Sequence, residues 1–334
     1  MTKVTRSIIP AKPAVFAALV AQAIGSMPLN AQVALSSVSE GAGARILLVQ
    51  QVDSPMEAIP AQLVIEDVGG SARIRSAGKL RMLSQRISAA ACNISAGVAA
   101  EMSAEVLTAT KTEFRAILDG LTNGNDALGM FGPEKRRLTL VEIEAVTVLW
   151  NDFEAAVDGV LAGTEMAANI DYIAANNEAL LKQANLLVSE ISGEYSNPAE
   201  MTQAKAMMVD ISARQRMLTQ KVAKEVCGVA SGNAAMGDPE KLAKTMDLFE
   251  VSLNALRGGM PEAGIGAAPT PEIKAVLDAS WEDWQRVKAE IAKVVETGSA
   301  DAETQALIFD LMNAKLGEID KASGLYSEYA RSTL

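Results

Sequence analysis

The sequence predicts an all-α protein built from two tandem up-down four-helix bundles that are related by a pseudo-twofold axis. Hydrophobic residues make up 49% of the 334 residues, yet aromatic residues make up only 4%, which favours helices over a β-sandwich. Apolar residues recur every three or four positions, as in amphipathic helices. The second half also repeats the first. We therefore expect one bundle at 71–196 and another at 197–334.

The repeat is clearest between residues 78–92, GKLRMLSQRISAAAC, and residues 213–227, ARQRMLTQKVAKEVC. Both segments carry Arg-Met-Leu, a glutamine and a final cysteine at an offset of 135 residues. Further on the offset is 131 residues, which aligns Trp150 with Trp281. The first copy therefore has four extra residues between 124 and 150. Chance does not explain this agreement, and we interpret the chain as a tandem duplication.

Each copy is expected to hold four helices with short connections. The expected ranges are 71–99, 103–122, 139–162 and 168–195 in the first copy, and 198–232, 238–257, 270–297 and 300–331 in the second. Ser103 and its equivalent Asp238 are the predicted N-caps of the second helices. Thr139 and Thr270 are the predicted N-caps of the third helices, and Glu142 would complete a capping box with Thr139. The aromatic residues of the third helices are expected in the cores: Trp150, Phe153, Trp281 and Trp284.

The N-terminal residues 1–31 are predicted to be a secretory signal peptide. A basic start precedes an apolar stretch at 14–25, which is shorter than the ~20 residues that span a bilayer. Cleavage is expected after Ala31, with 21–23 as the competing site. The mature protein would then be soluble and periplasmic. Residues 32–70 are expected to form an irregular arm, either short strands or an ordered segment packed on the rest.

Composition also excludes several classes of function. The chain has no histidine, which removes Ser-His-Asp triads, zinc sites that use histidine, and the Glu-x-x-His di-iron bundle. A net charge of −11 argues against nucleic acid as a partner. Neither a nucleophile–base pair nor a metal-ligand cluster is visible. We therefore predict a protein that is not an enzyme and needs no cofactor or metal.

The first helix of each copy carries two distinct faces. One face is apolar and should lie in the bundle core: Leu80, Leu83, Ile87, Ala90 and Ile94. The other is a heptad seam of small and polar residues: Gly78, Arg81, Gln85, Ser88 and Cys92, repeated as Ala213, Arg216, Gln220, Ala223 and Cys227. Small residues beside an arginine let another helix approach closely. A partly dehydrated guanidinium then needs an anion, with Ser84, Gln85, Thr219 and Gln220 as further polar contacts.

Residue chemistry alone leaves two kinds of partner possible for these arginines. Arg81 and Arg216 could pair with carboxylates on neighbouring helices, because buried charges are normally paired. Alternatively, the two arginines could grip one small planar oxyanion across the pseudo-twofold axis, since the arginine fork donates two parallel hydrogen bonds.

The cysteines give a separate hypothesis. Cys92 and Cys227 lie on the same seam, about 16 Å along the helix from the arginines. If the first helices run side by side and parallel, the two sulfurs approach each other and an exported compartment would permit a disulfide. The alternative is a pair of reduced cysteines that act as small packing residues.

The segments KLRMLSQR at 79–86 and RQRMLTQK at 214–221 resemble the first-helix signature of the PilJ/NarX-type sensor family. The resemblance covers residues 71–334 in two copies. It implies an extracytoplasmic input module of membrane receptors, of which some members bind nitrate or nitrite where two first helices meet. That role would fall on Arg81 and Arg216. Further matches are Gly78, for the small residue that lines the site, and Arg86, for the second basic residue; the second copy has Ala213 and Lys221 there.

The sequence therefore predicts a periplasmic sensor protein, related to chemotaxis receptors, that binds nitrate or nitrite between the first helices of its two bundles. The alternative is a helical interaction module without a ligand. That module would dock on a membrane receptor, a pilus component or a reductase.

Overall fold

A computed structural model describes residues 69–195 and 203–332 of the chain. Within these ranges the protein folds into long α-helices with no extended strand, which confirms the all-α prediction. The helices are α2 (Gly70–Ser95), α3 (Ala100–Asn123), α4 (Arg137–Ala162), α5 (Met166–Tyr195), α6 (Gln203–Ser231), α7 (Pro239–Gly258), α8 (Pro271–Thr297) and α9 (Ala302–Ser332). Two single-turn 3-10 helices, Asp126–Leu128 and Pro261–Ala263, follow α3 and α7 at equivalent places.

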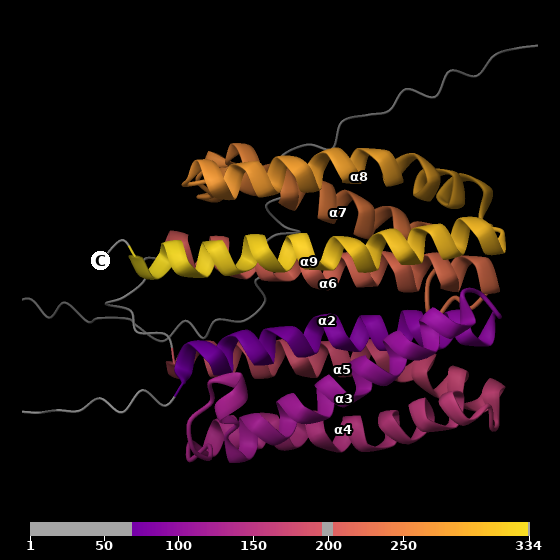
Figure 1. Ribbon diagram of the computed structural model, residues 1–334, viewed down its shortest axis with the longest axis horizontal. Helices are drawn as coiled ribbons and strands as arrows, with labels where there is room; N and C mark the ends of the chain where they lie inside the picture. The colour runs from indigo at the N-terminus through magenta and orange to yellow at the C-terminus, as the bar shows by residue number, and fades with distance from the viewer. Residues whose placement is uncertain (1–68, 196–202, 333–334) are drawn as a thin grey trace, which may run out of the picture. The chain divides into compact units, whose positions relative to one another are not determined.

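The helices pack in two rings (Figure 1). In the first ring α2 contacts α3, α3 contacts α4, α4 contacts α5, and α5 returns to α2. The second ring repeats this order with α6, α7, α8 and α9. We call these rings the first bundle and the second bundle. Helices α2 and α6 join them and lie side by side along their length.

Some predictions fall outside the described residues. These include the signal peptide at 1–31, nearly all of the arm at 32–70, and the boundary between copies at 196–197. Among the helices that the structure describes, none combines the length and the apolar character that a membrane crossing requires.

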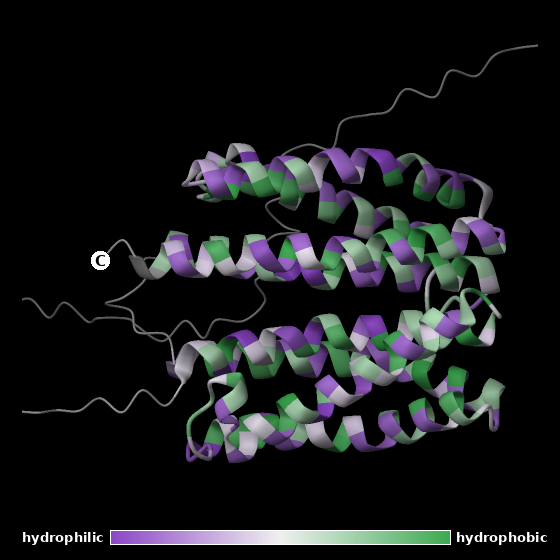
Figure 2. Ribbon diagram, in the orientation of Figure 1, coloured by the Kyte–Doolittle hydropathy of each residue, from purple (hydrophilic) through white to green (hydrophobic). Residues whose placement is uncertain are grey.

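Hydrophobic and hydrophilic residues are interspersed along every helix (Figure 2), and most of the buried residues are hydrophobic. Trp150 and Phe153 are fully buried in the first bundle, where Trp150 stacks on Phe114 with ring centroids 3.9 Å apart. In the second bundle Trp284 takes this place beside Phe249, at 4.5 Å. Trp281 was expected in the core as the equivalent of Trp150. Instead it is only partly buried, and the Arg257 guanidinium lies 4.8 Å from its ring centroid.

The predicted N-caps of the second bundle are confirmed. The Asp238 carboxylate accepts a hydrogen bond from the backbone N–H of Lys241 at 2.9 Å. The Thr270 hydroxyl accepts one from the N–H of Ile273 at 3.2 Å. A proline follows each cap at the first helical position, where its missing N–H is no loss.

The predicted N-caps of the first bundle are wrong. Helix α3 begins at Ala100, so Ser103 lies inside its first turn. Helix α4 begins at Arg137, and the buried Thr139 hydroxyl has no hydrogen-bond partner within the part of the chain that the structure describes. Glu142 accepts a hydrogen bond from the Gln183 amide instead of closing a capping box.

Candidate functional site

Helices α2 and α6 meet along the seam of small and polar residues. A disulfide joins Cys92 of α2 to the equivalent Cys227 of α6, with their Cα atoms 6.2 Å apart. Both cysteines are buried. Because equivalent residues meet across the contact, the two helices run parallel and in register, as the disulfide hypothesis required.

The two seam arginines converge three turns away from the disulfide. Arg81 is 2% exposed and Arg216 is 3% exposed. A Cβ atom placed on Gly78 would lie 3.7 Å from Arg81 Nη2 and 3.9 Å from Arg216 Nη2. Gly78 therefore faces both guanidinium groups, and its lack of a side chain leaves the space between α2 and α6 to them.

Each arginine is paired with an aspartate, as the first of the two alternatives predicted. Arg81 Nη1 donates to Asp210 Oδ1 at 3.2 Å, and Arg216 Nη1 donates to Asp320 Oδ1 at 2.5 Å. The sequence pattern did not single out these aspartates. Their equivalents in the other copy are Arg75 and Ser189, so neither carboxylate belongs to the repeated motif.

Both arginines keep one buried edge unused. Within the described parts of the chain, Arg81 Nε and Arg216 Nε have no hydrogen-bond partner. In a guanidinium, Nε–H and Nη2–H point in the same direction and form a fork that matches two oxygens of a planar oxyanion. The aspartates engage Nη1, so this fork remains in each arginine. A buried donor without a partner is costly, and two at equivalent positions indicate a place for an acceptor.

Charged side chains of both signs surround the arginine pair. Asp210 also accepts a hydrogen bond from Arg214 Nε, at 2.7 Å from its Oδ2. Burial would raise the pKa of Asp210, but Arg81 and Arg214 outweigh it and hold the pKa below its usual range. Burial lowers the pKa of Arg81, and Arg214 and Arg216 lower it further against the opposing effect of Asp210. Arg81, Arg214 and Arg216 thus lie close together, and Asp210 and Asp320 pair with them.

The hydroxyls predicted to line the site are already engaged. Ser84 Oγ donates to the carbonyl oxygen of Arg81 at 2.8 Å, and Thr219 Oγ1 donates to that of Arg216 at 2.7 Å. Gln85 and Gln220 are fully buried on the seam. The Gln85 amide lies 3.3 Å from Ser84 Oγ, and the Gln220 amide donates to a carbonyl of α9. These four residues line the seam, and a direct role in binding remains a prediction.

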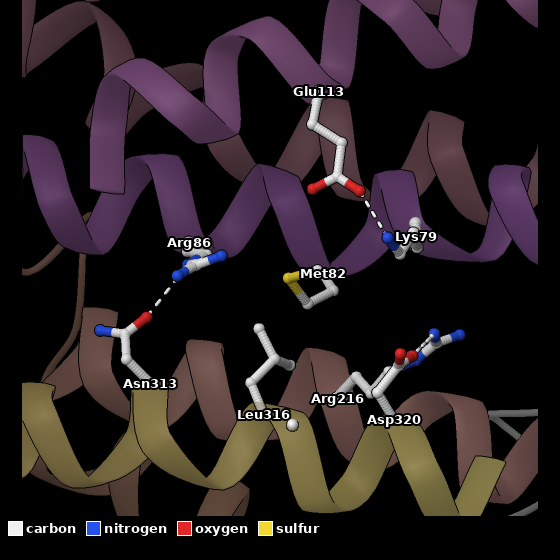
Figure 3. Close-up of a pocket in the computed structure, with 9 residues that line it drawn as sticks. Lys79, Met82, Arg86, Glu113, Arg216, Asn313, Leu316 and Asp320 are labelled. Atoms are coloured by element: carbon white, nitrogen blue, oxygen red, sulfur yellow. Dashed lines mark hydrogen bonds and ion pairs between the residues drawn. The ribbon is translucent and has the colours of Figure 1, made fainter. Parts of the chain in front are cut away.

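A solvent-accessible groove of about 220 Å³ opens beside the arginine pair, between α2, α3 and α9 (Figure 3). Its lining combines charged and apolar side chains: Lys79, Met82, Arg86, Glu113, Arg216, Asn313, Leu316, Gly317 and Asp320. Arg86 lies here rather than on the α2–α6 seam, and its Nε donates to Asn313 Oδ1 at 3.0 Å. The second basic residue of the motif therefore faces the groove.

A second polar cluster lies between α5 and α6, and sequence reasoning missed it. Lys224, 1% exposed, donates to Asn177 Oδ1 and to Glu178 Oε1, both at 2.8 Å. Lys221 lies 3.1 Å from the same Glu178 oxygen and 2.9 Å from the buried Glu225. Burial would raise the pKa of Glu178, but the two lysines lower it to about 2. No group of three or more cysteine, aspartate or glutamate side chains in the described ranges is arranged to hold a metal ion.

Comparisons with known proteins match this architecture. The family model described as "Type IV pili methyl-accepting chemotaxis transducer N-term", PilJ, matches twice, at residues 66–175 and 200–308. The methyl-accepting chemotaxis protein McpN of Pseudomonas aeruginosa is 32% identical over 91 residues. That match covers 27% of this chain and 17% of McpN, so the chain matches a small part of that receptor. Transducer domains of this kind are sensory, signalling modules rather than catalytic ones. The chain belongs to the PilJ family and carries two tandem copies of its sensory domain.

Proposed function

We propose that this protein is a periplasmic sensor that binds one small planar oxyanion, nitrate or nitrite, between Arg81 and Arg216. One observation carries the proposal: two buried arginines from equivalent positions meet beside Gly78, and each has an Nε without a partner. A planar anion between them could accept from both forks at once.

The surroundings favour a compact, monovalent ligand. The space lies between two closely packed helices, and Asp210 and Asp320 already neutralise part of the positive charge of its arginines. The net charge of −11 would repel anions at long range. Affinity would therefore come from hydrogen bonds in a desolvated site, where they are strong and only weakly screened by salt.

The tandem arrangement would allow a single chain to form the anion site. Some members of the PilJ/NarX-type family bind nitrate or nitrite where the first helices of two subunits meet. Here α2 and α6 belong to one chain, and a disulfide holds them together. The site would then need no second subunit, and a membrane receptor or another periplasmic protein would read the bound state.

The second candidate is an interaction module without a ligand. It is favoured by the ion pairs themselves, since Asp210 and Asp320 already neutralise part of the charge of both arginines. In this case the helical module would dock on a membrane receptor, a pilus component or a reductase, and the arginines would have a structural role.

Isothermal titration with sodium nitrate and sodium nitrite distinguishes the two candidates. We expect one anion per chain in the wild type. Binding should be lost in the double variant Arg81→Lys, Arg216→Lys, which keeps both charges but removes both forks. Arg286→Lys is the matched control, because Arg286 is exposed on α8.

The outcomes separate clearly once circular dichroism shows that each variant is folded. One anion per two chains would move the site to an interface between chains. Absence of heat with either anion would favour the interaction module.

A further inference from the structure

The two aspartates that pair with the arginines are held very differently. Asp210 uses both carboxylate oxygens, Oδ1 with Arg81 and Oδ2 with Arg214, and its side chain is 37% exposed. Asp320 uses Oδ1 with Arg216, and its side chain is 52% exposed. Within the described residues, the Asp320 carboxylate forms its ion pair with Arg216. Asp320 is therefore the carboxylate that can leave more easily.

Asp320 also lies in the groove through which solvent reaches Arg216. It lines the groove between α2 and α9, next to the Arg216 guanidinium (Figure 3). Arg216 lines the same groove but is almost completely buried. The other two cations of the groove bind neutral or acidic side chains of its lining: Lys79 pairs with Glu113, and Arg86 donates to Asn313. A small anion that enters the groove thus reaches Arg216 beside the Asp320 carboxylate.

We propose that Asp320 is a gate for the oxyanion site: its carboxylate occupies Arg216 in the empty protein, and the anion enters from the α2–α9 groove by displacing it. This inference rests on the proposed function. Two anions close to one guanidinium repel each other strongly in a partly buried site. Rotation of the exposed Asp320 side chain towards solvent removes this repulsion, and the incoming anion replaces it as the counterion of Arg216.

The gate assigns distinct roles to the two aspartates. Asp210 is fixed by two arginines and stays in place, so it positions Arg81 for the ligand. Asp320 competes with the ligand and sets its affinity. Its departure also removes a direct tie between α9 and α6, because Arg216 belongs to α6 and Asp320 to α9. Ligand binding would thereby loosen α9 at this level.

Nitrate titration of the full chain and two matched variants tests the gate. Asp320→Asn keeps the size of the side chain but removes the charge that competes for Arg216. We expect nitrate to bind about five- to tenfold more tightly, since the Asp320 charge no longer repels the incoming anion at Arg216. Glu113→Gln removes the same charge from the same groove without touching Arg216, and there we expect at most about a twofold change, as for a solvent-screened charge.

Each outcome has one meaning. Tighter binding in Asp320→Asn alone supports the gate, and so does binding that appears in Asp320→Asn when the wild type shows none. An equal gain in both variants would show that groove charge acts at a distance and would overturn the gate. Wild-type binding with no gain in Asp320→Asn would overturn the gate and leave the proposed function standing. If neither protein binds nitrate while folded, both proposals fail.

Discussion

In the two bundles, different residues donate the hydrogen bond to a carbonyl at the C-terminal end of an equivalent helix. The Leu121 carbonyl lies in the last turn of α3, where helix carbonyls have no partner within the helix. It accepts a hydrogen bond from Arg73 Nη1 at 2.8 Å. The equivalent Leu256 carbonyl of α7 accepts one from the Tyr326 hydroxyl at 3.0 Å. The duplicated fold has thus kept the requirement for a donor but not the residue that supplies it.

The difference extends into the four extra residues of the first copy. Tyr195, the equivalent of Tyr326, donates to Glu134 at 2.5 Å, and Glu134 lies in the longer loop of the first copy. Glu134 also accepts from two backbone N–H groups and lies 3.6 Å from Arg73. Burial and this hydrogen bond raise the pKa of Tyr195 to about 12. An insertion therefore allowed a buried ionic network where the second bundle keeps one neutral hydrogen bond.

The largest expected effect comes from breaking that network. Glu134→Ala removes the carboxylate that lies 3.6 Å from the buried Arg73 and that accepts the hydrogen bond of the Tyr195 hydroxyl. We expect a loss of about 4 kcal/mol in the free energy of unfolding, as for other broken buried ion pairs. Tyr326→Phe in the second bundle should cost about 1 kcal/mol. Urea unfolding followed by circular dichroism measures both, and equal losses would contradict the contrast between the bundles.

The disulfide is a second covalent link between the two copies, in addition to the polypeptide chain. Replacement of Cys92 and Cys227 by alanine removes a bridge that spans 135 residues. We expect a loss of about 3 kcal/mol from the greater entropy of the unfolded chain. The two bundles should also begin to unfold separately, so that the urea curve broadens or splits. A single transition at an unchanged midpoint would show that packing of α2 on α6 suffices.

The flanks of the α2–α6 contact also differ between the copies. On the α5 side, the buried Lys224 pairs with the exposed Glu178 and with the buried Asn177. At the equivalent positions on the α9 side the chain has Ala89, Phe309 and Ile308. At this level the contact is therefore ionic on the α5 side and apolar on the α9 side, so only the α5 side is expected to respond to pH here.

Glu178 gives this pH dependence a definite sign. Its pKa falls from 4.5 to about 2 on folding, so the folded state favours the charged carboxylate. The stabilisation is fully present above about pH 4.5 and is lost as the pH falls towards 2. Glu178→Gln should flatten the fall in stability over this window, whereas Glu296→Gln, at an exposed position of α8, should not. The check is the urea midpoint measured from pH 5 to pH 2.5, and identical slopes for both variants would refute this role.

Much of this fold and part of the site follow from the sequence. Apolar periodicity and the internal repeat place all eight described helices within a few residues, apart from α6, whose expected start lies outside the described residues. The repeat also pairs Cys92 with Cys227 and Arg81 with Arg216, because equivalent positions meet when two copies pack about a twofold axis. Local sequence signals could not predict the contacts made by residues that lie outside the repeated motif.

The aspartates and the first-bundle caps show why. Asp210 and Asp320 have Arg75 and Ser189 as equivalents, so the repeat carries no trace of them. Their pairing with the arginines depends on how α6 is placed beside α2 and how α9 is placed beside α6. The extra residues before α4 likewise let that helix begin at Arg137, ahead of Thr139. A cap signal read from residue type alone could not detect this shift.

The smallest expected effect concerns these two threonines, which occupy equivalent positions in different surroundings. Thr270→Val removes the hydroxyl that accepts from the Ile273 N–H, and we expect a loss of about 1 kcal/mol, typical of an N-cap. Thr139→Val removes a buried hydroxyl that has no partner within the described ranges, so stability should stay the same or rise by up to about 1 kcal/mol. Thermal unfolding of the two variants beside the wild type compares them directly. Because valine matches threonine in shape at both positions, opposite shifts would reflect the hydrogen bond alone, and equal losses would mean that Thr139 has a cap role that the structure does not show.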